Sequence, residues 1–123
     1  MLKRDDPIIQ RIIKIASGFG IFDCMPCAIS IKAFLVKQGI HGKQIQIDTG
    51  SQDPIYGRIY DDSIDELIAT TGHHQGIAVM IEESEIMFDN IHPQGIQRSV
   101  WMQNFYSPIL ENGQNFIITE ILF

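Results

Sequence analysis

The chain has 123 residues, 45% of them hydrophobic and 20% charged, which is typical of a single globular domain with its own hydrophobic core. Nine basic and fifteen acidic side chains give a net charge of -6, which argues against binding to the phosphate backbone of nucleic acids. Two cysteines are too few for a secreted disulfide scaffold, and no signal peptide or membrane-length apolar run is evident, so we expect a cytoplasmic protein without a membrane partner.

Two helices are predicted in the first third of the chain. Asp6-Pro7 combines an N-cap with proline at the first helical position, and isoleucines then recur at helical spacing up to Ser17-Gly18. A second helix is predicted over residues 24–38, with Pro26 in its first turn and Gly39 after its end.

The remaining two thirds predict mainly strands. Residues 44–48 alternate between polar and apolar and indicate a half-buried strand. A long surface loop with a short strand at 58–60 should follow, and then a short helix capped by Ser63 that contains Ile64, Leu67 and Ile68.

The C-terminal half begins with a predicted hairpin. Residues 76–82 and 85–89 form its strands and Glu83-Ser84 its turn. Residues 97–105 should be helical and residues 115–122 a last strand. This order predicts an α+β fold, a single domain over 1–123 with N-terminal helices packed on a small antiparallel sheet.

Cys24 is the first candidate for chemistry, because it falls where a loop becomes the second helix. A helix N-terminus carries roughly half a positive elementary charge, which favours a thiolate and makes the sulfur a nucleophile. The alternative interpretation is a buried structural cysteine, since free cysteines are commonly buried.

A thiolate nucleophile needs a base, and His74 and Asp89 lie at the two ends of the predicted hairpin. Antiparallel strands joined by a tight turn bring such ends toward each other. A turn at Glu83-Ser84 sets Asp89 opposite Ala78, so contact with His74 requires an earlier turn or a bulge. The carboxylate would then fix the tautomer and orientation of the imidazole.

Three blocks of sequence resemble a known family. They are Cys24-Met25-Pro26-Cys27-Ala28, Gly72-His73-His74-Gln75-Gly76-Ile77 and Phe88-Asp89-Asn90-Ile91-His92-Pro93. The first is similar to the nucleophile helix of papain-like and transglutaminase-like domains. In order, over about residues 20 to 105, the three resemble the papain-fold toxin domain 2 family of bacterial polymorphic toxins.

The resemblance implies a papain-like core and a catalytic triad of Cys24, His74 and Asp89. It also implies a cysteine-dependent enzyme acting on amide bonds of a protein or peptide, as a peptidase, deamidase or transglutaminase. Domains of this family are commonly the C-terminal part of a larger toxin delivered into a target cell, and they are paired with an immunity protein.

Three positions leave alternatives open. Cys27 also lies in the first turn of the predicted helix, His73 competes with His74, and Asn90 competes with Asp89 because papain uses an asparagine there. No glutamine lies just upstream of Cys24 to serve as a papain-style oxyanion donor, so we expect backbone N–H groups of the helix N-terminus in that role.

Other functions fit the sequence less well. Cys24-x-x-Cys27 with His73 and His74 offers zinc ligands, but adjacent histidines on a strand point apart. A thioredoxin-type redox pair would need a strand–helix alternation that this sequence lacks. We therefore predict no metal and no cofactor. A catalytically inactive protein-binding module is the remaining alternative to an enzyme.

Two further groups of side chains are assigned no chemistry. Trp101, Phe105 and Tyr106 have helical spacing and are interpreted as packing residues. His92 lies in a predicted turn beside Asp89, and we interpret it as a solvated turn histidine.

Overall fold

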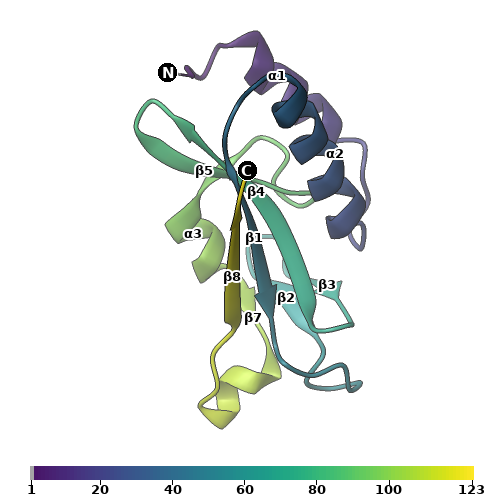
Figure 1. Cartoon of the computed structure of the whole chain (residues 1–123). Helices are drawn as coiled ribbons and strands as arrows, with labels where there is room; N and C mark the ends of the chain where they lie inside the picture. The colour runs from purple at the N-terminus through teal and green to yellow at the C-terminus, as the bar shows by residue number, and fades with distance from the viewer. Residues whose placement is uncertain (1) are drawn as a thin grey trace.

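The computed structural model describes residues 2–123 and consists of two sheets with helices on them (Figure 1). The first two helices are α1 (Pro7–Ala16) and α2 (Cys24–Lys37), and α3 (Arg98–Gln103) and the 3₁₀ helix η1 (Pro108–Asn112) lie near the C-terminus. The strands are β1 (Lys43–Asp48), β2 (Ile59–Asp61), β3 (Glu66–Ala69), β4 (His73–Ile81), β5 (Ser84–Phe88), β6 (Ile96–Gln97), β7 (Phe105–Tyr106) and β8 (Ile117–Leu122).

All the strand pairs in both sheets are antiparallel. The larger sheet has the order β6-β5-β4-β1-β8, and the smaller one has the order β3-β2-β7. The predicted α+β class, with N-terminal helices packed on an antiparallel sheet, is confirmed.

The N-terminal helices begin as the sequence predicts. The Asp6 carboxylate accepts a hydrogen bond from the Ile8 backbone N–H at 2.9 Å, and Pro7 occupies the first helical position. The second helix runs from Cys24 to Lys37, and Gly39 follows it with a φ of +71°, a backbone conformation that glycine adopts readily.

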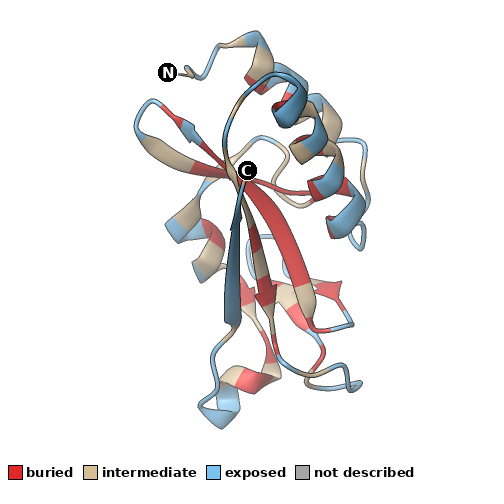
Figure 2. Cartoon of the chain, viewed as in Figure 1, coloured by how far each residue is buried: buried red, intermediate tan, exposed pale blue. Residues whose placement is uncertain are grey.

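Two hydrophobic cores lie on the two faces of the larger sheet. One packs α1 and α2 against β4 and β5, with Ile12, Ile31 and Ile77 fully buried. The other lies where β1 and β4 meet the smaller sheet and α3, and it includes Ile47, Ile59 and Trp101. Strand β4 belongs to both cores and is buried along most of its length, whereas β8 is exposed throughout (Figure 2).

The predicted helix after Ser63 is wrong, because Leu67 and Ile68 lie in strand β3. This strand pairs with β2, and the Asp61 carboxylate accepts a hydrogen bond from the Ser63 backbone N–H at 2.8 Å in the turn between them. Cross-strand pairing with Tyr60 outweighs the helical spacing of the three apolar residues.

The predicted hairpin has a turn one residue earlier than expected. Glu82 and Glu83 form it, with φ values of +49° and +72°, and the strands pair Ile81 with Ser84. Two positive φ angles match the mirror-image turns that suit the twist of a hairpin. The first strand also begins at His73 rather than Gly76, so both histidines lie within β4.

The C-terminal predictions hold in outline. The helix predicted over 97–105 is shorter, ending at Gln103, because Phe105 and Tyr106 pair with β2 as strand β7. The last strand starts at Ile117, two residues later than predicted. Within residues 2–123, no helix has the length and apolar character needed to cross a bilayer.

Candidate active site

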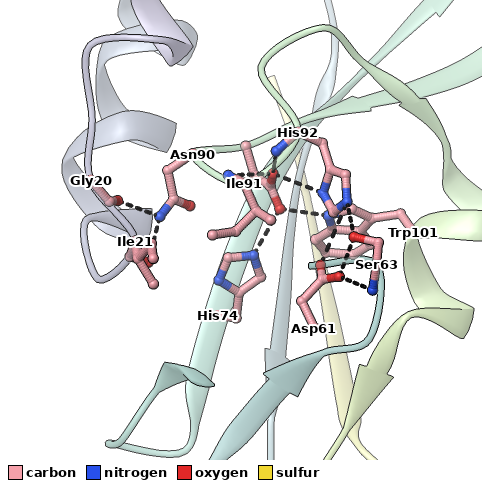
Figure 3. Close-up of polar contacts among 10 residues, drawn as sticks. Gly20, Ile21, Asp61, Ser63, His74, Asn90, Ile91, His92 and Trp101 are labelled. Atoms are coloured by element: carbon pink, nitrogen blue, oxygen red, sulfur yellow. Dashed lines mark hydrogen bonds and ion pairs between the residues drawn. The ribbon is translucent and has the colours of Figure 1, made fainter. Parts of the chain in front are cut away.

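Cys24 is the first residue of α2, and its position is set by the loop before that helix. The Asp23 carboxylate accepts a hydrogen bond from the Gly20 N–H at 3.0 Å instead of binding the first turn of the helix. Asn90 ties the loop to the sheet by donating to the carbonyls of Gly20 and Ile21, both at 2.7 Å (Figure 3). The N-terminus of α2, with Cys24, is therefore fixed next to the segment that follows β5.

His74 and Asp89 form a buried ion pair. His74 Nε2 lies 2.8 Å from Asp89 Oδ2, and both side chains have no exposed surface. The earlier turn explains this contact, because Ile77 pairs with Phe88 and Asp89 therefore follows opposite Gly76. A Cβ atom at Gly76 would lie only 3.3 Å from the Asp89 Cβ, so glycine leaves the room that this carboxylate needs.

Electrostatics favour a charged histidine at this site. Burial by itself lowers the pKa of His74, but the hydrogen bond and charge of Asp89, together with the nearby Cys24 side chain, outweigh it and raise that pKa to about 9. Burial alone would raise the pKa of Asp89, yet its hydrogen bonds with His74 and His92 hold it well below its usual range. The same contacts favour an imidazolium and a carboxylate over a neutral pair.

The second ring nitrogen of His74, Nδ1, does not contact Asp89. Nδ1 is buried and has no hydrogen-bond partner among residues 2–123. The Cys24 side chain is nevertheless close enough to help raise the pKa of the imidazole. One nitrogen of His74 therefore serves Asp89, and the other is available to the cysteine.

Aromatic side chains enclose the histidine. The Trp101 ring centroid lies 5.9 Å from that of His74, and the Phe105 centroid lies 5.2 Å away. The Trp101 indole N–H also donates to Asp89 Oδ2 at 2.7 Å. The interpretation of Trp101 as a packing residue was therefore incomplete, since it is both core and a hydrogen-bond donor to the acid.

The two cysteines have different surroundings. Cys24 is 9% exposed, whereas Cys27 is fully buried in the core between the helices and the sheet. Burial, with the nearby charges of Asp89, Cys24 and Asp23, raises the pKa of Cys27 to about 12. A thiol in that state is a poor nucleophile, so the surroundings favour Cys24 over Cys27.

The competing residues His73 and Asn90 have other partners. His73 Nδ1 lies 2.9 Å from Asp48 Oδ1 on β1, and the two side chains keep 23% and 36% of their surfaces exposed. The amide of Asn90 holds the loop before α2 and does not pair with His74. The two histidines thus bind different carboxylates on opposite faces of β4, an arrangement that separates them as metal ligands.

A cleft of about 350 Å³ opens beside Cys24. Phe22 lines it from the loop before α2 and Met25 from the first turn of that helix, Ile68 and Ala69 line it from β3, and His73 lines it from β4. Phe22 and Met25 are 62% and 54% exposed, so both are accessible to a molecule bound in the cleft. Thr70 and Thr71 also line the opening, so it offers both apolar and polar contacts next to the sulfur.

His92 is not the solvated turn residue that we predicted, and only 12% of its side chain is exposed. Its Nδ1 lies 3.2 Å from Asp89 Oδ1, and its Nε2 lies 3.0 Å from Ser63 Oγ (Figure 3). Asp61 and Ser63, which His92 Nε2 approaches, are about 30 positions earlier in the sequence. The three-residue spacing from Asp89 was the one local signal of this contact.

Comparison with known proteins identifies the family. The family model described as papain fold toxin 2 matches residues 7–106, a range that contains all three candidate residues. No curated protein and no solved structure matches the chain. Papain-fold families are typically cysteine hydrolases or transferases. The match spans most of the 123 residues, and the chain therefore belongs to the papain fold toxin 2 family.

Proposed function

We propose that this chain is a cysteine-dependent amide-bond enzyme with Cys24 as nucleophile, His74 as general base and acid, and Asp89 as the residue that orients His74. One observation carries the proposal: a fully buried His74–Asp89 pair lies within electrostatic reach of a cysteine at the N-terminus of a helix. This combination supplies a nucleophile, a proton carrier and a group that fixes the carrier.

The proposed reaction has two halves. The Cys24 sulfur bonds to the amide carbonyl carbon, His74 gives its proton to the departing amine, and the carbon–nitrogen bond breaks to leave a thioester on Cys24. His74 then accepts a proton from water as the oxygen attacks the thioester, and the acid product leaves with the thiolate restored. An amine in place of water gives a new amide.

The oxyanion of each tetrahedral intermediate needs donors. The backbone N–H groups at the start of α2 are suited to this task, because the Asp23 carboxylate is engaged by Gly20 rather than by the helix. The helix dipole adds positive potential at the same place.

We propose a protein or peptide substrate that places an apolar side chain in the cleft beside Cys24. Phe22 and Met25 would contact that side chain, with Ile68 beneath it. The family match supports a role as a toxin domain. We propose that it acts on a protein in the cytoplasm of a target cell and that an immunity protein inhibits it.

The first test is thiol alkylation by iodoacetamide between pH 4 and pH 10, with peptide mapping by mass spectrometry. Cys24 should be labelled rapidly below pH 7, where an ordinary thiol is mostly protonated. Cys27 should stay unlabelled until the protein is unfolded in guanidinium chloride, which also gives the reference rate of each thiol.

Two variants assign the nucleophile. Cys24→Ala should abolish labelling of the folded protein, and Cys27→Ala is the matched control that should leave it unchanged. Rapid labelling at Cys27 would move the nucleophile by one turn. Slow labelling at both cysteines, with the pH dependence of a free thiol, would refute the enzyme and favour the inactive binding module.

The outcome of the reaction can be read from target-cell extracts treated with wild type or Cys24→Ala. New peptide N-termini would show hydrolysis, glutamine-to-glutamate conversion would show deamidation, and incorporation of an added primary amine would show transglutamination. An extract that is identical after the two treatments would count against all three activities.

A further inference from the structure

The Asp89 carboxylate has two separate sets of partners. Oδ2 accepts from His74 and from Trp101, as described above. Oδ1 accepts from the backbone N–H groups of Ile91 at 3.0 Å and His92 at 2.6 Å, and it also lies 3.2 Å from His92 Nδ1. A second histidine therefore binds the same carboxylate from the side opposite His74 (Figure 3).

His92 bridges Asp89 to a second buried acid. Its Nε2 lies 3.6 Å from Asp61 Oδ2 and 3.0 Å from Ser63 Oγ. Asp61 has no exposed surface, and its Oδ1 accepts hydrogen bonds from the Ser63 N–H and hydroxyl. Its Oδ2 has no hydrogen-bond partner within residues 2–123, so His92 is the cation closest to it in the contacts described.

The charges alternate along this chain of contacts. Cys24, Asp89 and Asp61 can each carry a negative charge, and His74 and His92 lie between them. Burial by itself lowers the pKa of His92, but the hydrogen bond to Asp89 and the charges of Asp89 and Asp61 outweigh it and raise that pKa. Without this cation, Asp61 would be a buried carboxylate with no ion-pair partner among residues 2–123, which would be strongly unfavourable.

We propose that His92 is a positioning residue that acts through Asp89: it holds the far oxygen of the carboxylate, links it to Asp61 of the smaller sheet, and shares the carboxylate's charge with His74. The proposal rests on the proposed function, because Asp89 matters to catalysis only if His74 does. It assigns a role to the contact between the two sheets, since Asp61 lies on β2 and Asp89 follows β5.

Sharing the carboxylate has a measurable consequence. Two imidazolium groups on one carboxylate repel each other, so each should lower the pKa of the other. His92 therefore limits how tightly Asp89 holds the proton on His74, which must be released to the leaving amine. Removing the charge of His92 while keeping a hydrogen-bond donor should make His74 hold its proton more tightly.

The test is an NMR titration of the imidazole resonances in wild type, His92→Gln and His92→Ala, combined with Cys24 alkylation rates. The glutamine amide still donates to Asp89 but carries no charge. In His92→Gln the titration midpoint of His74 should rise by about 1 pH unit, and the Cys24 labelling rate should stay within about threefold of wild type. In His92→Ala that rate should fall by about tenfold or more.

An unchanged His74 midpoint in His92→Gln, or equal labelling rates in the two variants, would overturn the proposal. Asp61→Asn changes the other carboxylate that contacts His92, and it provides a second test if the His92 variants do not fold. It should lower the titration midpoint of His92, and an unchanged midpoint would also overturn the proposal. The Trp101 indole resonance reports that each variant is folded.

These titrations do not depend on activity. If the midpoints move as expected but Cys24 proves unreactive, the proposed enzyme fails and the charge coupling between the two histidines stands. If Cys24 is reactive and the midpoints do not move, the enzyme stands and the role of His92 fails.

Discussion

Two neighbouring histidines on one strand form carboxylate pairs of almost the same length in opposite settings. His74 Nε2 lies 2.8 Å from Asp89 Oδ2 with both side chains fully buried, whereas His73 Nδ1 lies 2.9 Å from Asp48 Oδ1 with both partly exposed. Water cannot reach the buried pair to solvate either side chain if its partner is removed. In the partly exposed pair, solvent screens the interaction and can solvate both side chains. Burial, more than distance, distinguishes the proposed catalytic pair from the surface contact.

The comparison predicts the largest difference in reactivity. His74→Ala should slow Cys24 alkylation below pH 7 by about 10²- to 10⁴-fold, because the group that supports the thiolate is lost. His73→Ala, the matched control on the other face of β4, should change the rate by less than about threefold. The opposite ranking would make His73 and Asp48 the working pair.

The next largest difference should appear in stability. Asp89→Asn leaves His74 and His92 without their shared anion and should cost about 3–5 kcal/mol of unfolding free energy. Asp48→Asn should cost about 0–1 kcal/mol, as exposed ion pairs do. Urea denaturation at pH 7 measures both values, and similar losses in the two variants would contradict the burial argument.

The pH dependence of the unfolding free energy should also differ between the His74–Asp89 pair and the His73–Asp48 pair. Because the folded pKa of His74 is raised to about 9, the native state holds a proton that the unfolded chain releases above about pH 6.5. The unfolding free energy should therefore fall by about 1.4 kcal/mol per pH unit between those values. Below pH 4 stability should fall as well, since the pKa of Asp89 is depressed.

Histidine replacements provide the control for that slope. His74→Gln should flatten the decline between pH 6.5 and pH 9, whereas His73→Gln should leave it unchanged. Denaturant midpoints at four or five pH values are sufficient, and a slope that survives in His74→Gln would mean that another group carries it.

The smallest effect concerns one hydrogen bond. Trp101→Phe keeps a buried ring but removes the 2.7 Å donor to Asp89, which should cost about 1–3 kcal/mol. Tyr106→Phe removes the 2.6 Å hydrogen bond to Glu111 at the surface and should leave the unfolding free energy unchanged. Thermal unfolding of the two variants sharpens the comparison between buried and exposed contacts without touching a histidine.

The sequence was most informative where local signals and the fold agree. The capped first helix, the start of α2 at Cys24 and the hairpin that brings residues 74 and 89 together could all be predicted from turn and periodicity signals. The exact register could not, because Glu82-Glu83 lacks the asparagine or glycine that usually marks such a turn.

Long-range packing decided the features that the sequence did not indicate. Leu67 and Ile68 have helical spacing with Ile64, yet pairing with β2 makes them a strand. His92 contacts Asp61 and Ser63, which lie on β2 and in the turn after that strand. Neither contact leaves a local pattern, so sequence reasoning missed both.

The Trp101 hydrogen bond also gives the protein an internal optical reporter. The chain contains a single tryptophan, and its indole N–H is bonded to Asp89 while its ring lies 5.9 Å from that of His74. Imidazolium groups quench indole fluorescence on contact, so emission intensity should follow the protonation of His74 directly. The state of the site can therefore be observed in unlabelled protein, before any substrate is known.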